Sequence, residues 1–247
     1  MSAPGSDRLL LVMAYHSRRE LDRFQRILDH WDELVEMRTP FTLLLVRTID
    51  EELRTDLPRI DLRRSEDASR PSLELVAEEF LEICRYVEDN LECRCWFWWE
   101  HDVLPVRKDC FDFFLRRWRA GTSIMGYRVR DRLWNMKNRI NGVAFYSRTY
   151  WSHLKPHIRP SQAFDTWRTY TRRADGRSFV ELNRWYALVH HEKHLYLTPS
   201  LRLVHGISDD TLFEDLVGGT RHHRRVSRPY RALRLHVRRA LLNWQMR

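Results

Sequence analysis

The stretch CWFWWEHDVLP, residues 95–105, places three tryptophans directly before two carboxylates that have one histidine between them. Its aromatic half is rich in strand-forming residues and predicts a buried strand. Glu100 and Asp102 stand two residues apart at the end of this strand, so in extended geometry both side chains point the same way and His101 points away. Ligands of open α/β sheets bind beyond the carboxyl ends of the strands, which favours a site here. The alternative is structural: Asp102 caps a turn before Pro105, and Glu100 is solvated.

Two strand–helix patterns precede this segment. LLLVMAYH (residues 9–16) and FTLLLVRT (residues 41–48) predict buried strands, whereas the charged, proline-containing segment 50–71 predicts a loop or an irregular crossover. Ser17 with Glu20 has the pattern of a capping box, and Ser72 is the predicted cap of a second helix. The apolar face predicted for this second helix consists of Leu73, Val76, Ala77, Phe80, Cys84 and Val87. The alternation predicts an α/β fold of nucleotide-binding topology, with a mostly parallel sheet flanked by helices.

The composition is that of a globular protein, with 43% hydrophobic and 31% charged residues. No apolar run approaches the roughly 20 residues that span a bilayer, and the N-terminus lacks the basic region of a signal peptide. The four cysteines form no CxxC pair, which favours a reduced, cytoplasmic setting. Neither GxGxxG nor GxxxxGK[ST] occurs, which argues against a dinucleotide enzyme and against a P-loop NTPase.

The net charge of +9 is concentrated at the C-terminus, where nine arginines and no acidic residue follow Asp215. Without these nine, the 43 lysines and arginines fall to 34, equal to the 34 acidic residues. Tyr230, Leu233, Val237, Leu241 and Trp244 fall at helical spacing among them. We therefore predict one domain at residues 1–217 and a basic amphipathic helical tail at residues 218–247. The tail either docks on the domain with its arginines in water or binds nucleic acid or an anionic membrane surface.

Glu-x-Asp after an apolar strand resembles the DxD-type metal site of GT-A glycosyltransferases, with glutamate in place of the first aspartate. Further segments follow in the order of that family. IMGYR (residues 124–128) resembles the next strand, and INGVAFYSR (residues 140–148) resembles the Asn-Gly-x-Ala-x-Tyr segment near the donor sugar. FDTW (residues 164–167) is similar to the acidic element on the acceptor side, and LVHGISD (residues 203–209) to the segment of the late histidine. The resemblance, to small viral or bacterial members, covers about residues 8–210.

The resemblance implies a Rossmann-like GT-A fold and a metal-dependent glycosyltransferase. Such an enzyme moves a hexose or pentose from a nucleotide sugar, with UDP-sugar as the first candidate, to a hydroxyl acceptor. Asp102, Glu100 and His205 would bind Mn²⁺ or Mg²⁺, and the imidazole favours Mn²⁺. Tyr15 would stack on the base, and Asn141-Gly142 would form a tight turn close to the sugar. The residues predicted to bind the donor are Ala14, Tyr15, His16, Arg19, Arg47, Glu100, Asn141 and Gly142. For Arg19 and Arg47 ordinary surface charge is the alternative.

An inverting transfer needs a base near the acceptor hydroxyl, and Asp165 followed by Glu192 are the candidates. A retaining enzyme would not need this base. LVHHEKH (residues 188–194) also places His190 and His194 at a spacing that suits zinc, but the order HExxH is not met.

The predicted acceptor is a hydroxymethylated pyrimidine base in DNA, with the basic tail on the phosphates, or alternatively a cell-surface or lipid-linked glycan. An alternative of another class is a non-catalytic nucleic-acid-binding protein in which Glu100 and Asp102 are structural. We expect a cytoplasmic protein, and a virus-infected cell is one such setting.

Overall fold

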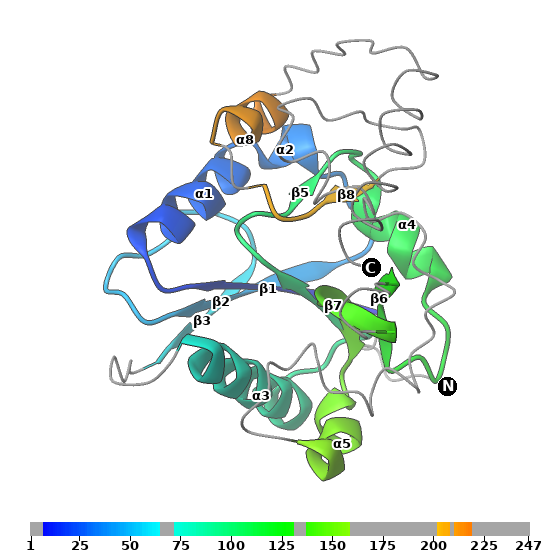
Figure 1. Cartoon of the computed structure of the whole chain (residues 1–247). Helices are drawn as coiled ribbons and strands as arrows, with labels where there is room; N and C mark the ends of the chain where they lie inside the picture. Colours follow the sequence, from blue (N-terminus) through cyan, green and yellow to red (C-terminus); the bar gives the residue numbers. More distant parts are fainter. Residues whose placement is uncertain (1–6, 65–71, 131–136, 159–201, 208–209, 219–247) are drawn as a thin grey trace, which may run out of the picture.

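The computed structural model describes residues 7–64, 72–130, 137–158, 202–207 and 210–218 (Figure 1). Its centre is a six-stranded sheet of order β3-β2-β1-β4-β7-β6. The first four strands of this order run parallel, and β7 and β6 run antiparallel to their neighbours. The strands are β1 (Leu9–Tyr15), β2 (Phe41–Arg47), β3 (Arg59–Arg63), β4 (Cys95–Trp99), β6 (Ile124–Arg130) and β7 (Lys137–Ser147). The prediction of a mostly parallel sheet in an α/β fold is confirmed.

Helices cover both faces of the sheet (Figure 1). One core layer joins the sheet to α1 (Arg18–Asp29), α2 (Trp31–Leu34), α4 (Cys110–Arg117) and α8 (Asp210–Val217). The opposite layer joins it to α3 (Ser72–Asn90) and α5 (Tyr150–Leu154). The short 3₁₀ helix η1 (Lys155–His157) follows α5 directly. Along β4 the side chains alternate between the layers, with Phe97 and Trp99 toward the first and Trp96 and Trp98 toward the second. The strand is apolar throughout because both of its faces are buried.

The start of α1 forms as the sequence predicts. The Ser17 hydroxyl accepts a hydrogen bond from the Glu20 backbone N–H at 3.4 Å, and the Glu20 carboxylate accepts one from the Ser17 N–H at 3.0 Å. The same carboxylate accepts a second bond, from the His16 N–H at 2.6 Å. Glu20 therefore fixes the chain where it leaves β1 and enters the helix.

Two predictions of secondary structure were wrong in detail. The segment 50–71 contains the edge strand β3, in which charged residues alternate with the half-buried Ile60 and Leu62. Its exposed charges suit an edge strand. Because these charges alternate with single apolar residues, the segment contains no apolar run that would predict a strand. On α3, Val76 is 40% exposed, whereas Ile83, absent from the predicted face, is fully buried.

Asn141 and Gly142 lie inside β7 rather than in the predicted tight turn. The ladder with β6 runs from the pair Gly126–Ala144 to the pair Arg128–Ile140, so β7 carries extra residues there. Such a bulge bends the strand away from its partner. The Tyr146 hydroxyl donates to the Gly142 carbonyl at 2.6 Å inside the protein and ties the bulge to the regular part of β7.

A second, two-stranded sheet lies beside the carboxyl end of β4. It pairs β5 (Leu104–Pro105) antiparallel with β8 (Leu203–Val204), segments that are far apart in the sequence. We call residues 202–207 the histidine strap, because β8 brings His205 next to the end of β4. Among the described residues, no helix is long and apolar enough to cross a membrane. The described part of the chain ends at residue 218, so the predicted tail lies outside it apart from that residue.

Candidate metal centre

The two carboxylates of the opening segment stand on a tight turn that follows β4. Val103 donates its backbone N–H to the Glu100 carbonyl at 3.0 Å, which closes a turn over Glu100–Val103. The buried indole N–H of Trp99 donates to the Val103 carbonyl at 2.9 Å and braces the turn from the core. The prediction that extended geometry aligns Glu100 with Asp102 was therefore wrong. β4 ends at Trp99, and a hydrogen-bonded turn presents both side chains instead.

The histidine strap is bound to this turn through its main chain. Gly206 and Ile207 both donate their backbone N–H groups to the Asp102 carbonyl, at 2.9 and 3.0 Å. Gly206 has a φ of +78°, a conformation that glycine adopts without steric cost. His205 is thereby placed over the turn, although it lies far from Asp102 in the sequence. Main-chain hydrogen bonds alone therefore hold the backbone of the three candidate ligands in place.

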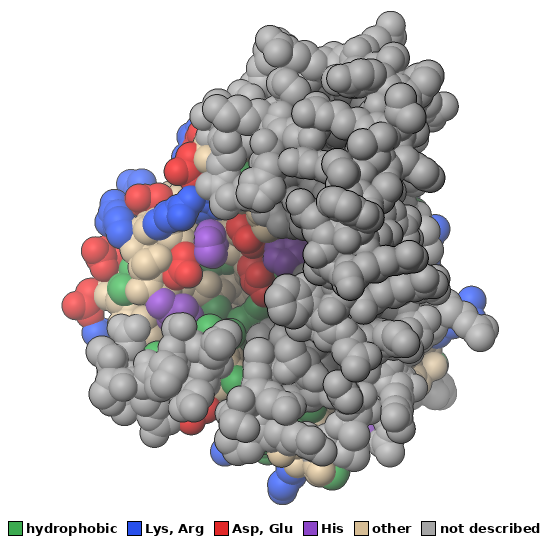
Figure 2. Space-filling view, viewed as in Figure 1, with side chains coloured by type: hydrophobic (Ala, Val, Ile, Leu, Met, Phe, Trp, Pro, Cys, Tyr) green, Lys and Arg blue, Asp and Glu red, His purple; other side chains and the backbone are tan. Residues whose placement is uncertain are grey.

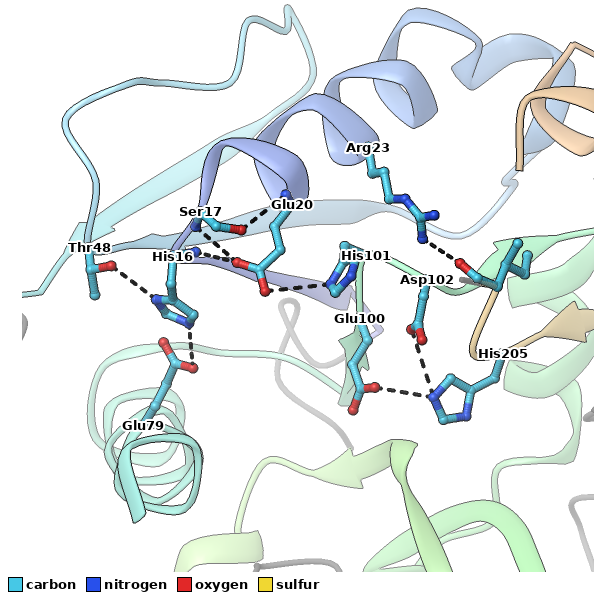
Figure 3. A network of polar contacts seen from close by, with 11 residues as sticks. His16, Ser17, Glu20, Arg23, Thr48, Glu79, Glu100, His101, Asp102 and His205 are labelled. Atoms are coloured by element: carbon cyan, nitrogen blue, oxygen red, sulfur yellow. Dashed lines mark hydrogen bonds and ion pairs between the residues drawn. The ribbon is translucent and has the colours of Figure 1, made fainter. Parts of the chain in front are cut away.

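Glu100, Asp102 and His205 converge as the resemblance implied (Figure 3). His205 Nε2 lies 3.2 Å from Glu100 Oε2 and 3.8 Å from Asp102 Oδ1. One donor atom of each residue lies within 4.8 Å of the others. Ligand atoms about 2.1 Å from one octahedral ion are about 3 to 4.2 Å apart, so small side-chain movements would complete the geometry. His101 turns away, with Nδ1 3.7 Å from Glu20 Oε1.

The electrostatics of the cluster favour a bound cation. Burial raises the pKa of the Asp102 carboxyl; the charge of His205 opposes this rise and that of Glu100 adds to it. Asp102 Oδ1 is shielded from solvent and accepts no hydrogen bond from any residue that the structure describes. A buried oxygen without a donor is costly, and a divalent ion would remove that cost. Two carboxylates and one imidazole are a donor set that fits Mn²⁺, and Mg²⁺ less well.

Of the other residues predicted to bind the nucleotide-sugar donor, Tyr15 and Arg47 are in the core. Tyr15 is 0% exposed and meets Phe24 edge-on with ring centroids 6.5 Å apart, so its ring offers no face to a base. Arg47 is buried and donates to the Ile49 and Asp50 carbonyls at 3.1 and 2.7 Å, and it pairs with Glu52. Both predictions are corrected for the same reason. β1 and β2 are buried on both faces, so residues near their ends belong to the packing.

The other residues predicted to bind the donor or to act as a base are not gathered at the metal centre by the part of the structure that is described. Arg19 is exposed and pairs with Asp210 at 3.3 Å, while Ala14 is half-buried on the α3 side of β1. Gly142 is buried in β7, and the side chain of Asn141 is not among the described residues. Asp165, Glu192 and the zinc-spaced histidines lie outside the residues that the structure describes.

His16 belongs to a second polar cluster, at the end of β1 (Figure 3). Its Nδ1 lies 3.2 Å from the Thr48 hydroxyl, and its Nε2 lies 3.0 Å from Glu79 Oε2. Glu79 comes from α3, is 2% exposed and also lies 3.4 Å from an Arg64 guanidinium nitrogen. Sequence reasoning named His16 but missed Glu79. The available signal was a carboxylate at position 79 inside the buried stripe that contains Phe80 and Ile83.

The two clusters lie on the same side of the molecule. Figure 2 shows histidine and acidic side chains gathered on the visible face, between the region of α1 and that of α3. Both clusters follow strands that are neighbours in the sheet, since β1 pairs with β4. After β1 the chain builds β2 and β3 on one side, and it then returns to build β4 on the other. The clusters therefore flank the point where the strand order reverses, which is where open α/β sheets bind ligands.

The His16–Glu79 pair predicts a pH-dependent contribution to stability. Burial disfavours the imidazolium, but the hydrogen bond and charge of Glu79, with the charge of Glu20, outweigh burial and the charge of Arg64, so the pKa of His16 is raised above 6.5. The stabilisation is fully present below pH 6.5 and is lost as the pH rises through the raised value. The free energy of unfolding of the wild type, minus that of His16→Gln, should therefore be larger at pH 6 than at pH 9. Urea titrations at both pH values measure this difference, and an equal difference at both would contradict the pairing.

Comparison with known proteins gives a fold but no family. No family model matches the chain, and no curated protein matches it. The structure of the galactosyltransferase LgtC in complex with donor and acceptor sugar analogs aligns with 91% of this chain and 99% of its own, at a TM-score of 0.56 and 11% identity. The apo form of the glycosyltransferase GlyE from Streptococcus pneumoniae TIGR4 aligns with 83% of this chain and 55% of its own, at a TM-score of 0.49 and 12% identity. The likeness to LgtC shows that the sheet and its helices form a GT-A-like fold.

Proposed function

We propose that this protein is a metal-dependent glycosyltransferase that moves a sugar from a nucleotide sugar to a hydroxyl acceptor. The observation that carries the proposal is the meeting of Glu100, Asp102 and His205 at the strand-order reversal of a GT-A-like fold. The likeness to a galactosyltransferase whose structure holds donor and acceptor sugar analogs supports the same reaction class. Asp102 Oδ1, which accepts no hydrogen bond from any residue that the structure describes, lies beside a second carboxylate, an arrangement that a non-catalytic protein would not need.

The site would assist departure of a nucleoside diphosphate. When bound, a divalent cation would neutralise the negative charge that develops on the leaving diphosphate. Asp102 and His205 would hold the ion from the turn and from the strap, and Glu100 would hold it directly or through the ribose. His16 is fixed by Thr48 and Glu79, so its imidazole would offer the nucleotide a rigid polar wall beyond β1.

UDP-sugar is the first donor candidate, and Mn²⁺ is the first cation because of the imidazole ligand. The acceptor is a hydroxymethylated pyrimidine in DNA, for which the nine arginines after Asp215 would neutralise phosphates. A glycan acceptor is the second candidate, since the aligned LgtC structure contains an acceptor sugar analog. Asp165 and then Glu192 are the proposed catalytic bases of an inverting transfer. The enzyme would act in the cytoplasm.

A screen of radiolabelled nucleotide sugars against plain DNA, hydroxymethylated DNA and glycan acceptors tests the proposal. We expect Mn²⁺-dependent transfer from one donor, loss of transfer in EDTA, and no transfer by Asp102→Asn. Asp22→Asn, which changes an exposed carboxylate on α1, is the matched control and should keep full activity. The proposal fails if the protein binds neither UDP nor GDP at millimolar concentration with Mn²⁺ and releases neither nucleotide from any nucleotide sugar. Salt-dependent binding of DNA without any transfer would favour the nucleic-acid-binding alternative.

A further inference from the structure

Helix α1 presents a row of arginines to α8. Arg19, Arg23 and Arg26 follow one another at helical spacing. They form ion pairs with two carboxylates of α8: Arg19 and Arg23 with Asp210, and Arg26 with Glu214. Figure 1 shows the two helices side by side. The side chains of Arg19 and Arg26 are 58% and 44% exposed, values at which ion pairs contribute little to stability. The side chain of Arg23 is only 5% exposed, which sets it apart from its neighbours.

The contacts of Arg23 join α1 to the histidine strap. One terminal nitrogen donates to the Ile207 carbonyl, and the other donates to the Asp210 carboxylate. The guanidinium also lies over the ring of Phe213, 4.7 Å from its centroid. A buried guanidinium loses its hydration and is tolerated only where such partners replace the water. Burial of Arg23 in this form therefore requires that the strap and α8 are both in place.

Ile207 is the residue through which Arg23 reaches the metal centre. Its N–H donates to the Asp102 carbonyl at 3.0 Å, and its own carbonyl accepts from Arg23. Both sides of this residue are thus held, one by the turn after β4 and the other by α1. His205 lies two positions earlier on the same strap, with Nε2 3.2 Å from Glu100. Without Arg23 the strap would still be held by β5 and by the turn after β4, but its end at Ile207 would no longer be tied to α1.

We infer that Arg23 is a positioning residue for the metal centre, which holds the histidine strap so that His205 meets Glu100 and Asp102. The inference rests on the proposed metal-binding role of those three residues. Arg23 touches neither the ion nor a substrate in this scheme. It raises the fraction of molecules in which the strap is docked, and metal affinity is proportional to that fraction when the undocked strap lacks the imidazole ligand. Reciprocally, a bound cation would strengthen the docking of the strap.

The test measures Mn²⁺ binding to the full chain from the electron paramagnetic resonance signal of free Mn²⁺, without reference to activity. Arg23→Met should raise the Kd for Mn²⁺ about 10- to 100-fold, the range typical of residues that orient metal ligands. Arg23→Lys keeps the positive charge and should recover part of the affinity. The recovery should be incomplete, because one ammonium group replaces the two terminal nitrogens that donate separately to Ile207 and Asp210. Arg26→Met is the matched control: Arg26 pairs with Glu214 on the same helix α8, and its loss should change the Kd less than about 2-fold.

A double-mutant cycle separates positioning from general loosening of the fold. In a His205→Ala background the imidazole is absent, so Arg23→Met should change Mn²⁺ affinity less than about 2-fold further. An equal loss in both backgrounds would overturn the inference, as would an unchanged affinity of Arg23→Met in the wild-type background. If Arg23→Met does not fold, Asp210→Asn removes an exposed partner of Arg23 instead and should weaken Mn²⁺ binding in the same His205-dependent way. Failure of the wild type to bind Mn²⁺ would count against the proposed function itself.

Discussion

Asp102→Asn should abolish the response of the protein to Mn²⁺ and UDP. In the wild type we expect the two together to raise Tm, because they bind the folded state. Asp102 supplies an oxygen that is shielded from solvent, and its main chain holds the strap that carries His205. Asparagine keeps the shape and the main-chain bonds but removes the charge, so we expect Mn²⁺ affinity to fall at least about 100-fold, the upper end of the losses seen for residues that only orient ligands. Thermal shift and a Mn²⁺ titration measure the two effects.

The metal-free form of the same variant should be no less stable than the wild type. Burial raises the pKa of Asp102, and Glu100 adds to the rise, so the charge on this side chain is unfavourable in the absence of a cation. Removal of such a charge should leave the free energy of unfolding equal or raise it by about 1 kcal/mol. Asp22→Asn should keep both the Tm and the metal response of the wild type. A full metal response in Asp102→Asn would place the cation elsewhere.

Trp99→Ala should produce the largest loss of stability, about 3–5 kcal/mol in the free energy of unfolding. Trp99 is 1% exposed, and its ring centroid lies 5.1 Å from that of Phe111 and 6.1 Å from those of Trp31 and Phe97. Alanine would leave a cavity among these rings and would also remove the donor to the Val103 carbonyl. Urea titration gives the loss.

Trp99→Phe separates the two roles of this tryptophan. Phenylalanine keeps much of the packing but cannot donate to Val103, so we expect a loss of about 1–3 kcal/mol for the unmet buried carbonyl and the smaller ring. Mn²⁺ affinity should fall several-fold as well, because the turn that presents Asp102 loses its brace. Trp151→Ala is the control, since Trp151 is a partly buried tryptophan on α5, on the opposite face of the sheet. The interpretation fails if Trp99→Ala costs no more than Trp151→Ala.

The sequence predicted those elements whose signal is local. The apolar runs of β1, β2 and β4 and the Ser17–Glu20 capping box are each contained in a few residues, and the structure has all of them. β3 was missed because an edge strand with charged residues lacks an apolar run. The family resemblance brought together Glu100, Asp102 and His205, which no local pattern could join. The prediction that extended geometry aligns the two carboxylates was nevertheless wrong, since a turn presents them.

The errors at Tyr15 and Arg47 have a common physical origin. A strand with one polar face reveals which residues point inward, but β1 and β2 are apolar on both faces. The sequence therefore gives no clue to the direction of their last side chains. Arg23 could not be recognised for another reason. The Ile207 carbonyl that it binds lies 184 positions away in the sequence, and arginines are abundant in this chain.

The pairing of β5 with β8 also means that the cluster of Glu100, Asp102 and His205 is completed late, both in folding and during synthesis. Leu203 pairs with Pro105, 98 positions earlier, whereas the first pair of β1 and β2 joins residues only 32 positions apart. Contacts between distant positions form slowly, because the entropy lost in closing a long loop must be overcome first. During synthesis, β1, β2, β4 and the turn with both carboxylates leave the ribosome long before His205 does. A chain that ends before residue 205 therefore carries the carboxylate pair without its imidazole partner, and only a product that extends past residue 205 contains all three proposed ligands.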